Sequence, residues 1–110
     1  MENIRDFHYR APRFQIDFPF LVHAESDQFI CGRCYEISEQ GLIAWLPEPL
    51  RVNATATLIF TLPGDPAEMT IAATVSRRFG FDHAFTFVSS SANDRARLHQ
   101  YLFARQSTES

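Results

Sequence analysis

Two arginines ahead of the first strand-like run are the first residues whose chemistry is distinctive. All ten basic residues of the chain are Arg and none is Lys. Arg10 and Arg13 follow Tyr9 immediately before that run. A guanidinium group binds phosphate oxygens through two parallel hydrogen bonds and stacks on purine rings. Taken singly, arginines in this place are more often solvated charges that flank a strand, and genome composition alone can produce an Arg-only chain.

A second group of polar residues lies where the next strand-like run ends. Glu36, Ser38 and Gly41 occur there within six positions. A carboxylate can accept hydrogen bonds from two neighbouring N–H donors at once. Ser38 can bind a ligand or hold its own turn, and Gly41 allows a positive φ or a close backbone approach. A tight turn needs such a glycine whatever the function, so these residues predict a turn before they predict a site.

Cys31 and Cys34 form a CxxC motif, which elsewhere is typical of zinc sites and redox pairs. Residues three apart on a strand point to opposite faces, so the two thiols cannot bind one metal unless the strand is bulged at Gly32. His23, opposite in the expected hairpin, is the candidate third ligand. We interpret Cys31 as a core residue and expect no metal site.

The sequence contains no motif of a catalytic site. It has no GxSxG, no glycine-rich phosphate loop before a helix and no pair of carboxylates at helical spacing. The histidines have no evident nucleophile partner. We expect that the chain is not an enzyme and that it has no catalytic residues and no cofactor.

Hydropathy alternates with a period of two along most of the chain, which is typical of half-buried strands. Six such runs are predicted: Phe14–His23, Phe29–Ile37, Leu42–Leu46, Ala54–Leu62, Met69–Ser76, and one that contains Phe85 and Phe87. Pro19 in the first run indicates an edge or a bulge. In the second run, the residues expected on one face are Phe29, Cys31, Tyr35 and Ile37. A turn is expected over Phe79–His83, after the basic pair Arg77 and Arg78.

The period changes after Ser91. Leu98, Tyr101 and Leu102 are spaced i, i+3 and i+4, which predicts an amphipathic helix of about three turns. Ser91 followed by Asp94 resembles a capping box at its start. Six short strands and one helix predict an all-β domain with one helix, a six-stranded antiparallel barrel with the helix on an open end or face.

Length and charge limit the organisation and the partners. A chain of 110 residues fits one domain. We divide it into a flexible arm over 1–13, the barrel and helix over 14–105, and a frayed tail over 106–110. The formal net charge of -3 argues against a broad surface for DNA or RNA. Neither a signal peptide nor a membrane-spanning run is evident, and two cysteines are too few for a disulfide framework. We therefore expect a cytoplasmic protein without membrane insertion.

The two polar groups, taken with this order of elements, resemble the PilZ domain family. Its signature is an RxxxR segment ahead of the barrel and a [DN]xSxxG segment after the second strand. The run Thr74–Leu102 also resembles the family's C-terminal half, where a strand ends in basic residues, a hairpin follows and a helix closes the domain. Members of the family bind the bacterial messenger cyclic di-GMP, so the resemblance implies a signalling receptor or adaptor with that ligand.

The resemblance also assigns roles. It implies that Arg10 and Arg13 bind the phosphates and guanine faces, that Glu36 accepts from the guanine N1 and N2 hydrogens, and that the arm wraps over the ligand and changes the surface shown to a protein partner. Ser38 and Gly41 complete the ligand-binding set. Tyr9, Arg77 and Arg78 are possible additions.

Two positions depart from the family's pattern. Tyr9 stands where the first motif arginine falls, so the spacing is one residue short, and Glu36 replaces Asp or Asn. An alternative is therefore a degenerate PilZ module that does not bind cyclic di-GMP and acts as a protein-protein interaction adaptor in motility or pilus function. A third alternative, a binder of single-stranded nucleic acid, is disfavoured by the net charge and by the alternating Phe residues.

Overall fold

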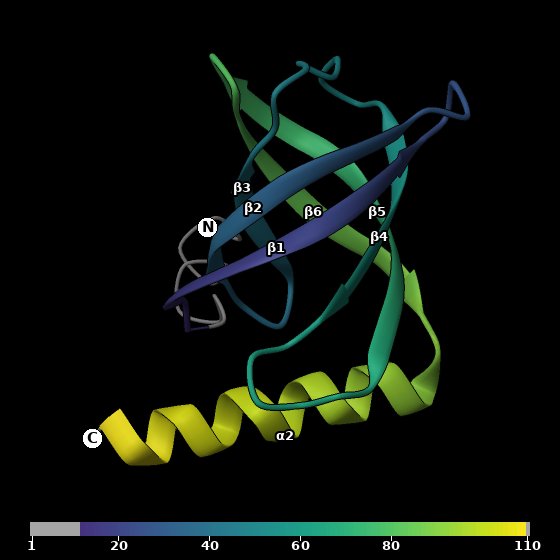
Figure 1. The fold of residues 1–110 in the computed structure, drawn as a ribbon. Coiled ribbons are helices and arrows are strands. Elements are labelled where there is room, and N and C mark those ends of the chain that lie inside the picture. The colour runs from purple at the N-terminus through teal and green to yellow at the C-terminus, as the bar shows by residue number, and fades with distance from the viewer. Residues whose placement is uncertain (1–11, 110) are drawn as a thin grey trace, which may run out of the picture.

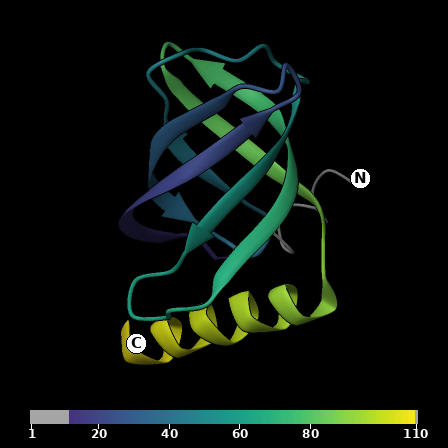
Figure 2. The ribbon, with the colours of Figure 1, turned by 45° about the vertical axis from the view of Figure 1, so that its right-hand side comes forward.

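Six strands close into an antiparallel barrel in the part of the chain that the structure, a computed structural model, describes: residues 12–109, with side chains from 12 to 105 (Figures 1 and 2). The elements are β1 (Phe14–Ala24), β2 (Phe29–Ile37), β3 (Gly41–Trp45), β4 (Thr55–Thr61), β5 (Glu68–Phe79), β6 (Asp82–Ser90) and α2 (Ala92–Glu109). Around the barrel the order is β1-β2-β3-β6-β5-β4, and β4 pairs with β1 to close it. This architecture confirms the predicted fold class.

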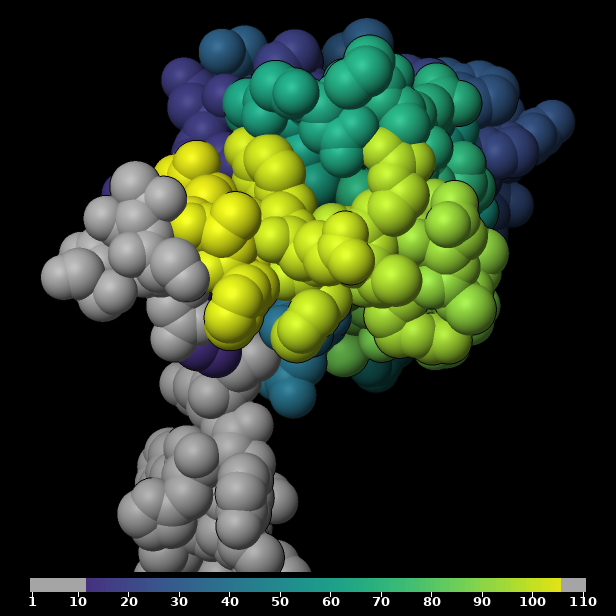
Figure 3. All heavy atoms as spheres, turned by 90° about the horizontal axis from the view of Figure 1, so that it is seen from below, coloured from purple at the N-terminus to yellow at the C-terminus, as the bar shows by residue number. Residues whose placement is uncertain are grey.

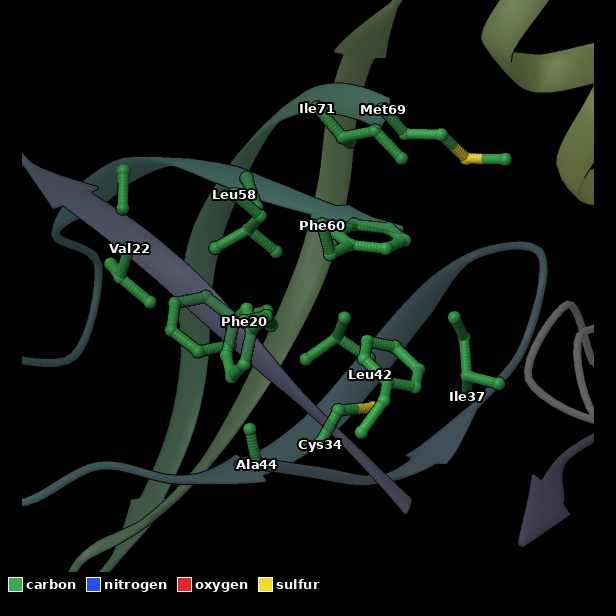
Figure 4. Close-up of a cluster of buried hydrophobic side chains, with 14 of the residues drawn as sticks. Phe20, Val22, Cys34, Ile37, Leu42, Ala44, Leu58, Phe60, Met69 and Ile71 are labelled. Carbon is green, nitrogen blue, oxygen red and sulfur yellow. The ribbon is translucent and has the colours of Figure 1, made fainter. Parts of the chain in front are cut away.

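The barrel interior is filled by one face of each strand. Phe20 and Val22 from β1 meet Leu58 and Phe60 from β4, and Ile71 of β5 lies beyond them (Figure 4). Such alternation buries every second residue of a half-buried strand, so the predicted core face of the first run is confirmed. The register of β1 against β2 is interrupted just before Pro19, between Gln15 and Phe18. Pro19 therefore follows a bulge, as its missing N–H led us to expect.

The predicted face of β2 was wrong. Ile30, Gly32 and Cys34 face the core, whereas Phe29, Cys31 and Tyr35 are exposed. The cause is an irregularity in the pairing with β3 between Cys34 and Glu36, which returns Ile37 to the interior. Counting back from Ile37 with a strict period of two therefore gives the wrong phase. Cys34, not Cys31, is the core cysteine.

The predicted turn between the last two strands was too long. β5 continues through Arg77 and Arg78 to Phe79, and β6 begins at Asp82, so only Gly80 and Phe81 connect them. Gly80 has a φ of +66°, a value that glycine adopts without strain. His83 lies within β6 and is fully buried. A polar residue at a core position made this strand look like a loop.

Helix α2 covers one end of the barrel (Figure 3). Leu98 and Leu102 are buried against the core, as predicted. Tyr101 donates from its hydroxyl to the Pro63 carbonyl at 2.9 Å. The helix is longer than the three turns expected, and its backbone continues through 106–109, which we had assigned to a frayed tail.

Candidate functional site

A hollow of about 400 Å³ lies on the outer surface of β2, β3, β6 and β5, and most of the predicted site residues line it. Its walls include Arg13, Glu36, Ser38, Gly41 and Arg77. The remaining lining residues are Ile37, Gln40, Leu42, Ile43, Ser76, Ala84, Phe85 and Thr86. Residues from Arg13, just before β1, to Thr86 on β6 are thus brought to one place. A concavity of this size is typical of a small-molecule site.

Strand register explains why these residues meet. Glu36 on β2 pairs with Ile43 on β3, Ile43 pairs with Ala84 on β6, and Ala84 pairs with Arg77 on β5. Paired residues of antiparallel strands point to the same face. Glu36 and Arg77 therefore lie on one face of the sheet, at opposite ends of this row, and Ile43 and Ala84 form the floor between them. Ala84 in that floor has only a methyl group, which leaves the space open. The acid and the base therefore face one another across a shallow groove.

Arg13 forms an ion pair with Glu36. Its Nη1 donates to Glu36 Oε2 at 3.1 Å, and the side chains are 46% and 20% exposed. An ionised carboxylate has about four lone-pair sites, so Glu36 keeps acceptor capacity after this contact. At such exposure the pair contributes at most about 1 kcal/mol to stability. Arg13 can therefore move to another anion at small cost.

Ser38 and Gly41 build the turn between β2 and β3. The Ser38 N–H donates to the Gly41 carbonyl at 2.9 Å, and Ser38 Oγ accepts from the Gln40 N–H at 3.1 Å. A Cβ on Gly41 would collide with the Phe85 carbonyl oxygen of β6. Among the described glycines, those with positive φ are Gly64 and Gly80, so Gly41 is needed for close approach to β6 rather than for positive φ.

The neighbouring arginines Arg77 and Arg78 have different surroundings. Arg77 lines the hollow, and within residues 12–105 no carboxylate pairs with its guanidinium. Arg78 does not line the hollow, because its Nη1 donates to the Gly80 carbonyl at 3.0 Å in the hairpin turn. The remaining candidates, Tyr9 and Arg10, lie outside the described residues.

The motif turn is also attached to helix α2. Glu39 Oε2 lies 2.8 Å from His99 Nδ1, so the turn that carries Ser38 contacts an element sixty residues away in sequence. Sequence analysis did not predict this contact, because nothing in the sequence relates Glu39 to His99.

His83 is a structural residue that the sequence analysis missed. Its Nδ1 lies 2.8 Å from the Phe81 carbonyl and so carries the proton, which leaves Nε2 to accept from the Leu50 N–H at 3.0 Å. Burial lowers the pKa of His83 below its ordinary value of 6.5. The neutral ring therefore ties the loop after β3 to the hairpin end of the barrel.

The CxxC motif does not form a shared site. Cys31 is exposed and Cys34 is buried, which confirms that the thiols lie on opposite faces. Burial raises the pKa of Cys34 to about 12, so its thiol stays protonated. His23 contacts Asp27 and stacks on Phe29 instead. Within the described residues, no three His, Cys, Asp or Glu side chains come together as metal ligands.

The sequence matches the PilZ domain family over residues 8–104. Solved structures that share the fold include the following two. The inhibitor of motility from Bacillus subtilis, MotI/DgrA, has a TM-score of 0.78 at 22% identity over 92% of this chain, which spans about half of that protein (52%). The PilZ domain of CeSA from a cellulose-synthesizing bacterium has a TM-score of 0.69 at 15% identity, covering 87% of this chain and 99% of that one. No curated protein matches the sequence.

These findings agree with the geometry. The second motif turn, the closed barrel and the terminal helix occur in the order that the resemblance implied. In the described part of the chain, no helix is both long and apolar enough to cross a bilayer. The family match extends over most of the sequence and includes both motif regions. The chain therefore belongs to the PilZ domain family.

Proposed function

We propose that this PilZ domain binds cyclic di-GMP in the hollow between Glu36 and Arg77 and transmits binding to a protein partner by ordering its N-terminal arm. The observation that carries the proposal is the convergence of Arg13, Glu36 and Arg77 on one concavity. The ligand has two phosphates and two guanines. A guanidinium without a carboxylate partner suits a phosphate, and a carboxylate suits the N1 and N2 donors of a guanine edge.

Arg13 is the residue through which binding would reach the arm. In the structure it rests on Glu36 at 3.1 Å, so a guanine on Glu36 would compete with it and a nearby phosphate would offer it a new partner. Arg10, three residues earlier, belongs to the same proposal as a second guanidinium. A ligand that bridges these arginines and the barrel favours one arm position over others, which is a population shift driven by differential contacts.

Titration calorimetry with cyclic di-GMP tests this proposal. Binding in the micromolar range or tighter corresponds to roughly −8 kcal/mol or better. We expect Arg13→Ala and Arg77→Ala each to weaken binding by roughly tenfold or more, since each removes a charge-assisted hydrogen bond. Arg78→Ala is the matched control, because its guanidinium contacts Gly80 outside the hollow, and it should bind as the unaltered chain does.

A second candidate function is supported by a specific observation. Glu36, Ser38 and Gly41 each have a complete structural role without a ligand: an ion pair, a turn and a close strand contact. The motif can therefore persist in an adaptor that has lost the messenger. Absence of heat at protein concentrations on the order of tens of micromolar would favour this adaptor and contradict the receptor.

A further inference from the structure

A second row of paired residues crosses the same outer surface, two residues along each strand from the row that forms the hollow. Trp45 on β3 pairs with Asp82 on β6, and Asp82 pairs with Phe79 on β5. Each lies two residues along its strand from the Ile43, Ala84 and Arg77 row that forms the hollow. Residues two apart share a face and lie about 7 Å apart. The aromatic row and the hollow are thus continuous parts of one surface.

The aromatic side chains of this row are open to solvent. Phe79 is 86% exposed and Trp45 is 46% exposed. Exposed apolar groups that adjoin polar residues are typical of ligand-binding surfaces when they form a continuous patch. Within residues 12–105 no ring contact joins Trp45 to Phe79, so the space between them is not filled by their own stacking.

The spacing of the row fits a planar base. β3 and β5 are separated by β6, so the strands that carry Trp45 and Phe79 are roughly 10 Å apart. A flat ring between two others needs about 7 Å between the outer planes, from two contacts of about 3.5 Å. Side chains that lean toward each other from these strands can bring the planes to that separation.

Asp82 supplies a hydrogen-bond acceptor between the two aromatic residues. Partial burial and the nearby Asp82 carboxylate raise the pKa of Tyr35, so Asp82 lies beside a hydroxyl of the same surface. An ionised carboxylate has about four lone-pair sites, so Asp82 can accept N–H donors. Among the nucleobases guanine presents two adjacent donors on one edge, at N1 and N2, which matches a carboxylate.

We infer that Trp45, Asp82 and Phe79 form a second guanine subsite, in which a guanine lies between the two aromatic rings with its N1 and N2 edge toward Asp82. The inference rests on the proposed binding of cyclic di-GMP. Glu36 faces only one guanine edge, and the ligand has two. The subsite accounts for the other base and places it beside Arg77, which lies two residues from Phe79 on β5.

The unaltered chain tests this directly, because Trp45 is its single tryptophan. A base stacked on the indole quenches its fluorescence. We expect titration with cyclic di-GMP to quench Trp45 emission with the same concentration dependence as the calorimetric heat, after correction with free N-acetyltryptophanamide for light absorbed by guanine. Quenching that does not saturate with the heat would overturn the subsite.

Variants give an independent readout. Trp45→Ala and Phe79→Ala should each weaken binding roughly tenfold, as expected for loss of base stacking. Phe29→Ala is the matched control, because Phe29 is 58% exposed and stacks on His23 at the far end of β2. Thermal unfolding confirms that each variant is folded.

The outcomes separate the subsite from the proposed function. Heat without quenching, with Trp45→Ala and Phe79→Ala binding as tightly as the unaltered chain, contradicts the subsite and leaves cyclic di-GMP binding intact. No heat with the unaltered chain contradicts both. Heat, quenching and weakened variants together support both.

Discussion

Gly41 is fixed by the backbone of β6. A methyl group there would meet the Phe85 carbonyl oxygen, which is held in the strand and cannot move aside easily. We expect Gly41→Ala to lower the free energy of unfolding by about 3 kcal/mol, measured by urea denaturation. Gly64 is the matched control, since it has a φ of +84° but no atom near a Cβ, and Gly64→Ala should cost about 1 kcal/mol. Equal losses in the two variants would argue against the steric explanation.

His83 makes stability depend on pH. Its pKa is lowered in the folded chain by burial, so the unfolded chain binds the proton more tightly. The stabilisation is complete above the unfolded value of about 6.5 and is lost as pH falls from there toward the lowered folded pKa, with a slope of at most about 1.4 kcal/mol per pH unit. The free energy of unfolding of the unaltered chain should therefore decrease as the pH is lowered below about 6.5.

His83→Gln separates this residue from the other histidines. The variant retains His8, His23 and His99, so their contributions are common to both proteins. We expect its stability to vary less with pH over the same interval, whatever its absolute value. Identical slopes in the two proteins would show that His83 does not titrate as proposed.

The sequence predicted which residues make up the candidate site but not the contacts that hold each of them. Glu36 and Arg13 could be selected because their types and order resemble a family motif. The division between Arg77 and Arg78 could not, since it depends on a strand bulge between Val75 and Arg77 and on one contact with Gly80. Burial of His83 could not be predicted, because the sequence does not show whether a histidine is neutral or charged.

Helix α2 begins at a side-chain cap. Ser91 Oγ accepts from the Asp94 N–H at 3.0 Å. The Asp94 carboxylate does not complete the predicted capping box but accepts from the Thr70 N–H of β5 at 3.2 Å. Asp94 is one methylene shorter than the usual Glu. The cap thus joins the start of the helix to the barrel.

Removal of this cap should loosen the helix and its contact with β5. We expect Ser91→Ala to reduce the free energy of unfolding by about 1 kcal/mol, measured by thermal or urea unfolding followed by circular dichroism. Ser89→Ala is the matched control, because Ser89 is exposed on β6 and should change stability by less than about 0.5 kcal/mol. A control variant as unstable as Ser91→Ala would contradict the capping role.

All six strands and the helix could be predicted from the sequence, but which face of each strand is buried could be predicted only in part. Alternation placed the β1 core face correctly because apolar residues continue on both sides of its bulge. The same rule failed on β2, where the irregularity before Glu36 exchanged the faces of Cys31 and Cys34. A bulge depends on pairing between strands, and periodicity within one strand cannot reveal it.

The order of the strands around the barrel was not predicted from the sequence. Alternation predicts strands but not their neighbours, and the pairing of β3 with β6 joins segments about forty residues apart. That pairing brings Glu36 and Arg77 to one surface. The site is therefore a property of the closed barrel, and no hairpin of the chain contains it alone.

The closure of the barrel is uneven. β1 pairs with β4 only over Leu21–Ala24, so among the described strands its earlier half is paired with β2 alone. Arg105 of helix α2 reaches this half and donates from Nη2 to the Gln15 carbonyl at 3.0 Å. Backbone amides with a strand on one side only open more easily than those with strands on both.

We therefore expect the backbone hydrogen bonds of the first half of β1 to open more often than those of its second half. In deuterated water, amides of residues 14–18 should exchange faster than those of 21–24, and Arg105→Ala should speed exchange in 14–18 without affecting 21–24. Uniform exchange along β1 would refute this. This segment follows Arg13 directly, so a ligand that binds Arg13 should slow amide exchange there. Deuterium uptake at one strand would then report occupancy of the site without any label on the protein.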